Sequence, residues 1–233
     1  MFIDLNADLG EGAGTDADLM PLITSANICC GFHAGDVDTV AAALELADQH
    51  GVRVGAHPGY ADRVNCGRVE LDFDEGEILR IGVYQLGALK ALAEMLGVDV
   101  AYLKPHGALY NQACRLDAYA TGVLAVAAEC GELPILGLPG SLLERRTMEE
   151  EAAFIREGFA DRRYRPDGSL VPRTESDALI RDPKEAVEQV EWLIGMQKVQ
   201  TVCVHGDTPG AVEFVRAVRG FLIDRGHELK AFV

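Results

Sequence analysis

The stretch that decides the fold is Phe2-Ile3-Asp4-Leu5-Asn6-Ala7-Asp8-Leu9-Gly10-Glu11-Gly12. Apolar and polar side chains alternate along it, so one face carries Ile3, Leu5 and Ala7 and the other carries Asp4, Asn6 and Asp8. Side chains of a strand point alternately to its two faces, and the pattern therefore predicts a strand over residues 2–8. Parallel strands covered by helices on both faces are normally apolar throughout. This strand therefore needs an interior that accepts charged groups.

The rest of the chain alternates strand and helix signals, which favours a parallel sheet. Further strands are predicted at 26–33, 52–57, 101–106, 134–139, 157–161, 201–207 and 228–233. Helices are predicted at 16–24, 37–50, 78–96, 116–130, 141–156, 185–196 and 211–225. Asp74 and Glu77 have the spacing of a capping box, and Asp182-Pro183 supplies an N-cap followed by an N1 proline.

A closed barrel explains the alternation better than an open sheet. Apolar faces would pack against outer helices, and polar faces would line the interior, where so many polar positions indicate a site. An open sheet would have to bury Asp4, Asn6 and Lys104 under a helix layer. We therefore expect residues 1–233 to form one β/α barrel domain.

Composition narrows the function classes. The chain has 233 residues and a net charge of −16, which disfavours binding to nucleic acid or to anionic membranes. No apolar run is long enough for a membrane span, and the N-terminus does not resemble a signal peptide. The six cysteines lack metal-ligand spacing and are expected to be reduced thiols. These features predict a cytoplasmic protein.

Polar residues gather where the predicted strands end. They are Asp8, His33, His57, His106, Asp161, His205 and Asp207. The carboxyl ends of barrel strands are where active sites lie, so these residues are expected around one cavity. One histidine at a strand end is more often a hydrogen-bonded core residue, but four of the six histidines converge here. The other two, His50 and His227, adjoin helix ends and are expected to have no role in the site.

The roles of these residues have alternatives. Imidazoles suit acid–base chemistry and also bind divalent metals. Asp8, His33 and His57 form a candidate metal trio. Lys104 suits a phosphoryl or carboxylate group, or else an internal salt bridge to Asp4 or Asp8.

Two loops add candidates for anion binding. The glycine-rich loop 8–14 matches neither the dinucleotide fingerprint nor the P-loop, so it is either an anion-binding turn or a flexible connection. Residues 159–173 contain four arginines and read as a long loop of the kind that covers active sites. Arg165 or Arg173 would meet an anionic substrate there.

These segments together resemble the LamB/YcsF family of lactam-utilisation proteins. The resemblance is carried in order along nearly the whole chain by residues 3–12, 25–36, 55–60, 104–111, 159–173 and 201–207. Two positions depart from the family pattern: Cys66 stands where an aromatic residue is expected, and Asp177 where glycine is expected.

The resemblance implies a seven-stranded, irregular parallel β/α barrel like those of glycoside hydrolases and deacetylases. It implies the A-type component of a 5-oxoprolinase, which uses ATP as cosubstrate to cleave 5-oxo-L-proline to L-glutamate together with two further subunits, of B and C type. The expected catalytic residues are Asp8, His33, His57, Lys104, His106 and His205. The expected substrate-binding residues are Asn6, Asn27, Arg68, Asn111, Asp161, Arg173 and Asp207.

Two other functions fit the same residues. A metal-dependent amide hydrolase or deacetylase would need no ATP. A subunit that only binds substrate would leave the chemistry to its partners, which the missing P-loop allows.

Overall fold

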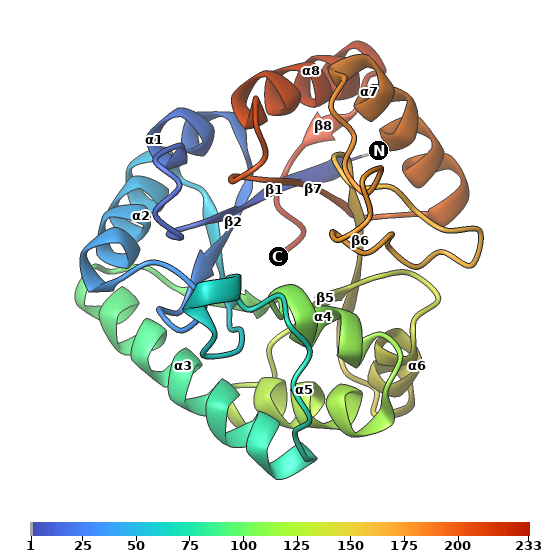
Figure 1. Cartoon of the computed structure of the whole chain (residues 1–233). Coiled ribbons are helices and arrows are strands. Elements are labelled where there is room, and N and C mark those ends of the chain that lie inside the picture. The colour runs from blue at the N-terminus through green and yellow to red at the C-terminus, as the bar shows by residue number, and fades with distance from the viewer. Residues whose placement is uncertain (1) are drawn as a thin grey trace.

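Seven parallel strands close into a barrel in the computed structural model, which describes residues 2–233 (Figure 1). The strands are β1 (Phe2–Leu9), β2 (Ser25–Cys29), β3 (Arg53–His57), β4 (Val100–Leu103), β5 (Ile135–Gly137), β6 (Phe154–Phe159) and β7 (Thr201–His205). Each pairs with the next along the chain, and β1 closes the ring by pairing with both β2 and β7. In this register Asp8 lies opposite Asn27 on one side and His205 on the other. The predicted barrel is therefore confirmed.

Helices surround the ring, as Figure 1 shows. They are α1 (Asp16–Leu19), α2 (Val37–His50), α3 (Glu75–Met95), α4 (Gly107–Ala113), α5 (Asp117–Glu129), α6 (Leu142–Glu149), α7 (Pro183–Trp192) and α8 (Ala211–Asp224). The predicted capping box is present, because Asp74 accepts from the backbone of Glu77 while the Glu77 side chain accepts from the backbone of Asp74. Asp182 caps α7 by accepting from the backbone N–H of Lys184.

Several predicted bounds were wrong. The second strand ends at Cys29, because Gly31 turns the chain with a φ of 80°, so His33 lies on a loop. The helix predicted at 141–156 stops at Glu149, and β6 begins at Phe154. Helix α4 was not predicted, since His106 makes no side-chain cap that would mark its start. The last strand is limited to β8 (Glu228–Leu229), which pairs with β1.

The two faces of β1 show how the fold uses the alternation. Ile3, Leu5 and Ala7 are fully buried against the outer helices, and Asp4 and Asn6 are fully buried in the polar interior. At the opposite end from the site, Phe232 of the C-terminal segment packs on Tyr102 with ring centroids 5.0 Å apart. No helix within residues 2–233 is long and apolar enough to cross a membrane.

Candidate active site

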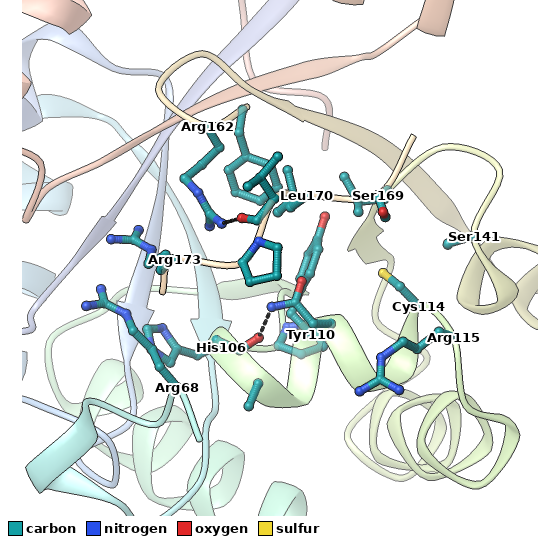
Figure 2. Close-up of a pocket in the computed structure, with 18 of the residues that line it drawn as sticks. Arg68, His106, Tyr110, Cys114, Arg115, Ser141, Arg162, Ser169, Leu170 and Arg173 are labelled. Atoms are coloured by element: carbon teal, nitrogen blue, oxygen red, sulfur yellow. Dashed lines mark hydrogen bonds between the residues drawn. The ribbon is translucent and has the colours of Figure 1, made fainter. Parts of the chain in front are cut away.

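A cavity of about 780 Å³ opens at the carboxyl ends of the strands (Figure 2). Asp8, His57, Lys104, His106 and His205 line its deep part. The long loop after β6 contributes residues between 162 and 174 to its wall, as expected for a loop that covers a site. The structure thus brings predicted residues from several strands and strand ends to one cavity.

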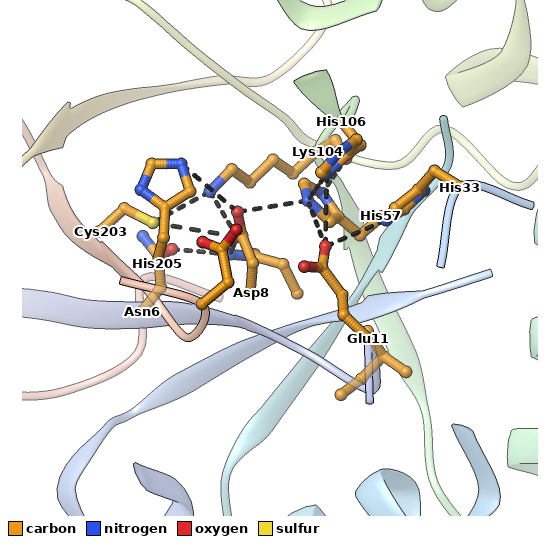
Figure 3. A network of polar contacts seen from close by, with 12 residues as sticks. Asn6, Asp8, Glu11, His33, His57, Lys104, His106, Cys203 and His205 are labelled. Carbon is orange, nitrogen blue, oxygen red and sulfur yellow. Dashed lines mark hydrogen bonds and ion pairs between the residues drawn. The ribbon is translucent and has the colours of Figure 1, made fainter. Parts of the chain in front are cut away.

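Lys104 lies in the floor of this cavity, as part of a buried ionic cluster (Figure 3). Its Nζ lies 2.8 Å from Asp8 Oδ1, 2.8 Å from Glu157 Oε1 and 3.2 Å from Cys203 Sγ. Burial opposes ionisation of Asp8, but His57 and Lys104 hold the pKa of its carboxyl well below the usual value. Of the alternatives that the sequence left open for Lys104, the structure therefore shows the internal salt bridge to Asp8.

Below the ionic cluster, a chain of hydrogen bonds fills the barrel. Asn27 Nδ2 donates to Asp8 Oδ1 and to Asn6 Oδ1, and Asn6 Nδ2 donates to Thr201. Asp4 accepts from the hydroxyls of Thr24, Ser25 and Thr201. Burial raises the pKa of Asp4 to about 6 despite these bonds. Asn6 and Asn27 therefore support Asp8 from below and do not line the cavity.

His57 and His106 meet at one side of the site with their tautomers fixed by backbone carbonyls. His57 Nδ1 lies 2.8 Å from the carbonyl oxygen of Lys104, and His106 Nε2 lies 2.8 Å from that of Cys66. A carbonyl only accepts, so both of these nitrogens carry a proton. The remaining two nitrogens, His57 Nε2 and His106 Nδ1, face each other at 2.9 Å.

Glu11 and His33 complete this group. Glu11 Oε1 is 3.0 Å from His33 Nε2, 3.4 Å from His106 Nδ1 and 3.9 Å from His57 Nε2. Burial opposes the charge of His33, but the neighbouring Cys29 and Glu11 raise its pKa to about 9. Glu11, His33, His57 and His106 each offer a ligand atom within 4.8 Å of the others, so they form a cluster that could hold a metal. It shares His33 and His57 with the predicted trio, and Asp8 Oδ2 lies 3.3 Å from His57 Nε2.

His205 stands on the other side of Asp8 and is held by a buried aspartate. Asp161 accepts from the backbone N–H of His205 at 3.2 Å, from its Nδ1 at 3.0 Å and from the hydroxyl of Thr208 at 2.6 Å. Burial opposes ionisation, but His205 lowers the pKa of Asp161 to about 2. His205 Nε2 is left facing the site, 3.8 Å from Asp8 Oδ2. This is the orientation that a general base needs.

Arginines give the outer part of the site a positive charge (Figure 2). Arg68 donates to Asp207 at 2.5 Å, and Arg173 lies 3.8 Å from the same carboxylate. Arg162 donates to the carbonyl of Val171, and its Nε has no hydrogen-bond partner among residues 2–233. Burial and the nearby Arg173 lower the pKa of Arg162 to about 10. In a chain with a net charge of −16, this concentration of cations gives the outer part of the cavity a charge that suits an anion.

Two glycines make room for the histidines. A Cβ on Gly59 would lie 2.7 Å from His33 Nδ1, and one on Gly67 would lie 2.8 Å from His33 Cβ. Gly67 also has a φ of +63°, which favours glycine. His33 and His106 consequently stack with ring centroids 3.7 Å apart and an interplanar angle of 5°.

The other predicted residues have varied positions. Asn111 lines the cavity and donates to the carbonyl of Gly107, and Asp161 is buried behind His205. In the glycine-rich loop, the backbone N–H of Gly10 donates to Asp16 Oδ2 at 2.8 Å. This N–H therefore already binds a carboxylate of the chain itself.

Sequence reasoning missed Glu11, Glu157 and Arg162. Glu157 is two and four residues before Phe159 and Asp161 and therefore shares their face of the strand, which was a usable signal for an inward-facing glutamate. The position of Glu11, in contrast, depends on the path of a loop.

Comparison with known proteins agrees with this geometry. The model of the LamB/YcsF family matches residues 3–233. The chain belongs to the LamB/YcsF family. Among relatives, the A-type 5-oxoprolinase subunit of Neisseria meningitidis serogroup C is 45% identical over 242 residues, covering 98% of this chain and 99% of that protein. The protein of the same description from Cutibacterium acnes is 41% identical, with 98% of each covered.

Solved structures of other proteins are similar to this barrel. The lactam utilization protein from Thermus thermophilus is 38% identical, covers 100% of both chains and gives a TM-score of 0.91. A family 4 carbohydrate esterase from Streptomyces lividans gives a TM-score of 0.56 at 9% identity, covering 100% of this chain and 93% of that one. The second likeness shows a shared deacetylase-type barrel and nothing about activity.

Proposed function

We propose that the chain is the A-type component of a 5-oxoprolinase, an enzyme that hydrolyses the cyclic amide 5-oxo-L-proline to L-glutamate at the expense of ATP. One observation carries the proposal: three arginines with a single aspartate lie at the mouth of a cavity whose floor is a buried Asp–Lys–His cluster. This arrangement offers an anion clamp beside acid–base groups, which a small lactam acid requires. The near-complete coverage of relatives described as A-type 5-oxoprolinase subunits supports it.

The reaction divides into steps that balance. The lactam oxygen attacks the γ-phosphorus of ATP and ADP leaves, which makes the lactam carbon electrophilic. Water adds to that carbon, and the ring C–N bond breaks with protonation of nitrogen, leaving γ-glutamyl phosphate. A second water hydrolyses this acyl phosphate to glutamate and phosphate. Two waters are therefore consumed for each ATP.

The side chains have matching roles. His205, oriented by Asp161, removes a proton from the attacking water. Arg173 and Arg162 hold the substrate carboxylate, because Asp207 balances only one of the three guanidinium charges at this point. The positive charge of Lys104 keeps Asp8 ionised. The polar contacts of the Lys104 ammonium are Asp8, Glu157 and Cys203, all within the chain. Lys104 therefore acts by positioning Asp8, and a phosphoryl group would have to displace one of its partners.

A metal-dependent amide hydrolase that needs no ATP is the second candidate function. The cluster of Glu11, His33, His57 and His106 is the observation that favours it. ATP-independent release of an amine or acid from amide substrates would support it over the first candidate.

The proposal includes partners and a compartment. The relatives' description as one lettered subunit of an enzyme supports a complex. We propose two further subunits of B and C type that supply the ATP site or part of it. A substrate-binding role without catalysis is the alternative within that complex.

The six cysteines are all unpaired thiols, which supports a cytoplasmic location.

Binding of the substrate acid to the isolated chain tests the anion clamp. Titration calorimetry with 5-oxo-L-proline should show binding, and 2-pyrrolidinone, the same lactam without its carboxylate, should bind at least about tenfold more weakly, the loss expected for a charge-assisted hydrogen bond. Arg173→Gln should remove this preference. Equal binding of the two lactams would contradict the assigned role of the arginines.

A further inference from the structure

His57 and His106 present two nitrogens to each other that need a cation or a proton between them. His57 Nδ1 and His106 Nε2 donate to backbone carbonyls, so in the neutral imidazoles His57 Nε2 and His106 Nδ1 both carry lone pairs. These two lone pairs face each other at 2.9 Å in a buried part of the chain. The carboxylates of Glu11 and Asp8 add negative charge at the same point (Figure 3). A cation near His57 Nε2 and His106 Nδ1 would be stabilised by both nitrogens and by both carboxylates.

We propose that this point binds one divalent first-row transition-metal ion through His57 Nε2, His106 Nδ1, Glu11 and Asp8. The backbone contacts have the form typical of metal-binding histidines, which donate the other ring N–H to a carbonyl or carboxylate. Two imidazoles with two carboxylates suit zinc, iron(II) or manganese(II) better than magnesium or calcium, which prefer oxygen ligands alone.

The separations between these atoms fit an ion of that size. Ligand nitrogens lie about 2.0–2.1 Å from zinc, so two ligands of a tetrahedral ion are about 3.3 Å apart. His57 Nε2 lies 2.9 Å from His106 Nδ1 and 3.3 Å from Asp8 Oδ2, and Glu11 Oε1 lies 3.4 Å from His106 Nδ1 and 3.9 Å from His57 Nε2.

His33 is excluded from the ligands by its stacking. Its ring is parallel to that of His106 within 5° at a centroid distance of 3.7 Å. An ion in the plane of His106, where the Nδ1 lone pair points, cannot also lie in the plane of His33. His33 instead contacts Glu11 at 3.0 Å and orients that carboxylate. The ligand set thus differs from the trio Asp8, His33 and His57 expected from the sequence.

Metal binding by the full chain, freed of metal with a chelator, tests the proposal without any activity assay. Titration calorimetry with Zn²⁺ and electron paramagnetic resonance with Mn²⁺ should show one ion per chain, and Mg²⁺ should not compete at equal concentration. His57→Gln, His106→Gln and Glu11→Gln should each weaken binding at least about 100-fold, more than a supporting residue typically does. His33→Gln should weaken it less than any of them, and His50→Gln should leave it unchanged.

The alternative occupant is a proton shared by the two imidazoles. Long-range ¹H–¹⁵N correlation spectra of the metal-free chain at neutral pH report which ring nitrogens carry protons, with His57→Gln and His106→Gln assigning the signals. Absence of Zn²⁺ and Mn²⁺ binding, with His57 Nε2 protonated toward His106, would overturn the proposal. Equal loss of binding in His33→Gln and His106→Gln would overturn the ligand set. Circular dichroism melts of each variant separate loss of a ligand from loss of the fold, so only variants that melt like the parent are compared.

Discussion

Lys104 Nζ lies 2.8 Å from Asp8 Oδ1 at the centre of the barrel, where the side chains are only 2% and 4% exposed. Glu157, on the other side of the same ammonium, is fully buried. A buried lysine between two carboxylates is strongly coupled to them, because removing it leaves two uncompensated charges. The stability of the barrel and the state of Asp8 therefore both depend on Lys104.

Lys104→Met should destabilise the protein as well as inactivate it. Breaking a buried ion pair costs about 3–5 kcal/mol, so a clear fall in the urea midpoint is expected. The double variant Lys104→Met with Glu157→Gln should recover part of that loss, since one of the two stranded carboxylates is then neutral. A Lys104→Met variant as stable as the parent would contradict the coupling.

Asp161→Asn should slow catalysis by the assembled enzyme while preserving the fold. The amide can no longer fix the proton on His205 Nδ1, and loss of an acid–base function costs about 10²- to 10⁴-fold in rate. Turnover and melting temperature should be measured together. Asp224→Asn, at an exposed position at the end of α8, is the matched control and should change neither. Unchanged turnover in Asp161→Asn would remove His205 from the acid–base assignment.

Arg162→Gln should raise KM for 5-oxo-L-proline more than it lowers kcat. Arg162 lines the cavity, and its buried Nε has no hydrogen-bond partner among residues 2–233, so the charge of this guanidinium lacks a full set of partners. Loss of a charge-assisted hydrogen bond costs about 1.5–3 kcal/mol, which is about 10- to 150-fold in KM. Arg225→Gln, in an exposed pair with Glu191, serves as control. A fall confined to kcat would place Arg162 in the chemistry and not in binding.

Asp4 should make the stability of the barrel depend on pH. Burial raises its pKa from the usual 3.8 to about 6, so between these values the folded chain keeps a proton that the unfolded chain loses. Stability should then fall as pH rises through this window, by about 3 kcal/mol for a shift of this size. The Asp4→Asn variant has no titratable group at this position, so it lacks this contribution to the pH dependence of stability.

Urea denaturation of parent and Asp4→Asn at pH 4 and pH 7 measures this effect. The difference in unfolding free energy, parent minus variant, should be lower at pH 7 by about that amount. The same difference at both pH values would show that Asp4 titrates normally.

Much of this architecture could be predicted from local sequence. The alternation of Ile3, Leu5 and Ala7 with polar residues predicted the barrel, because side-chain period depends only on strand geometry. The number of strands came from the family resemblance. Helix α4 could not be predicted, since its first residue follows His106 without a capping side chain.

The site was harder to predict in detail. The strand ends predicted that Asp8, His57, His106 and His205 would meet, because these ends share one rim of a barrel. Glu11, in contrast, reaches His106 only through the course of the loop after β1. His33 was expected on a strand, yet it lies on a loop whose packing depends on Gly59 and Gly67. Such contacts arise from long-range packing and have no local sequence period.

Glutamate formation from 5-oxo-L-proline tests most directly whether this chain supplies the lactam-opening site of an ATP-dependent complex. It should be measured with the purified chain, with and without the proposed B- and C-type partners and ATP. We expect glutamate only when all subunits and ATP are present, and loss of at least about 10²-fold when His205→Gln replaces the parent chain. Robust turnover by the chain alone without ATP, or full turnover of the complex with His205→Gln, would contradict this assignment.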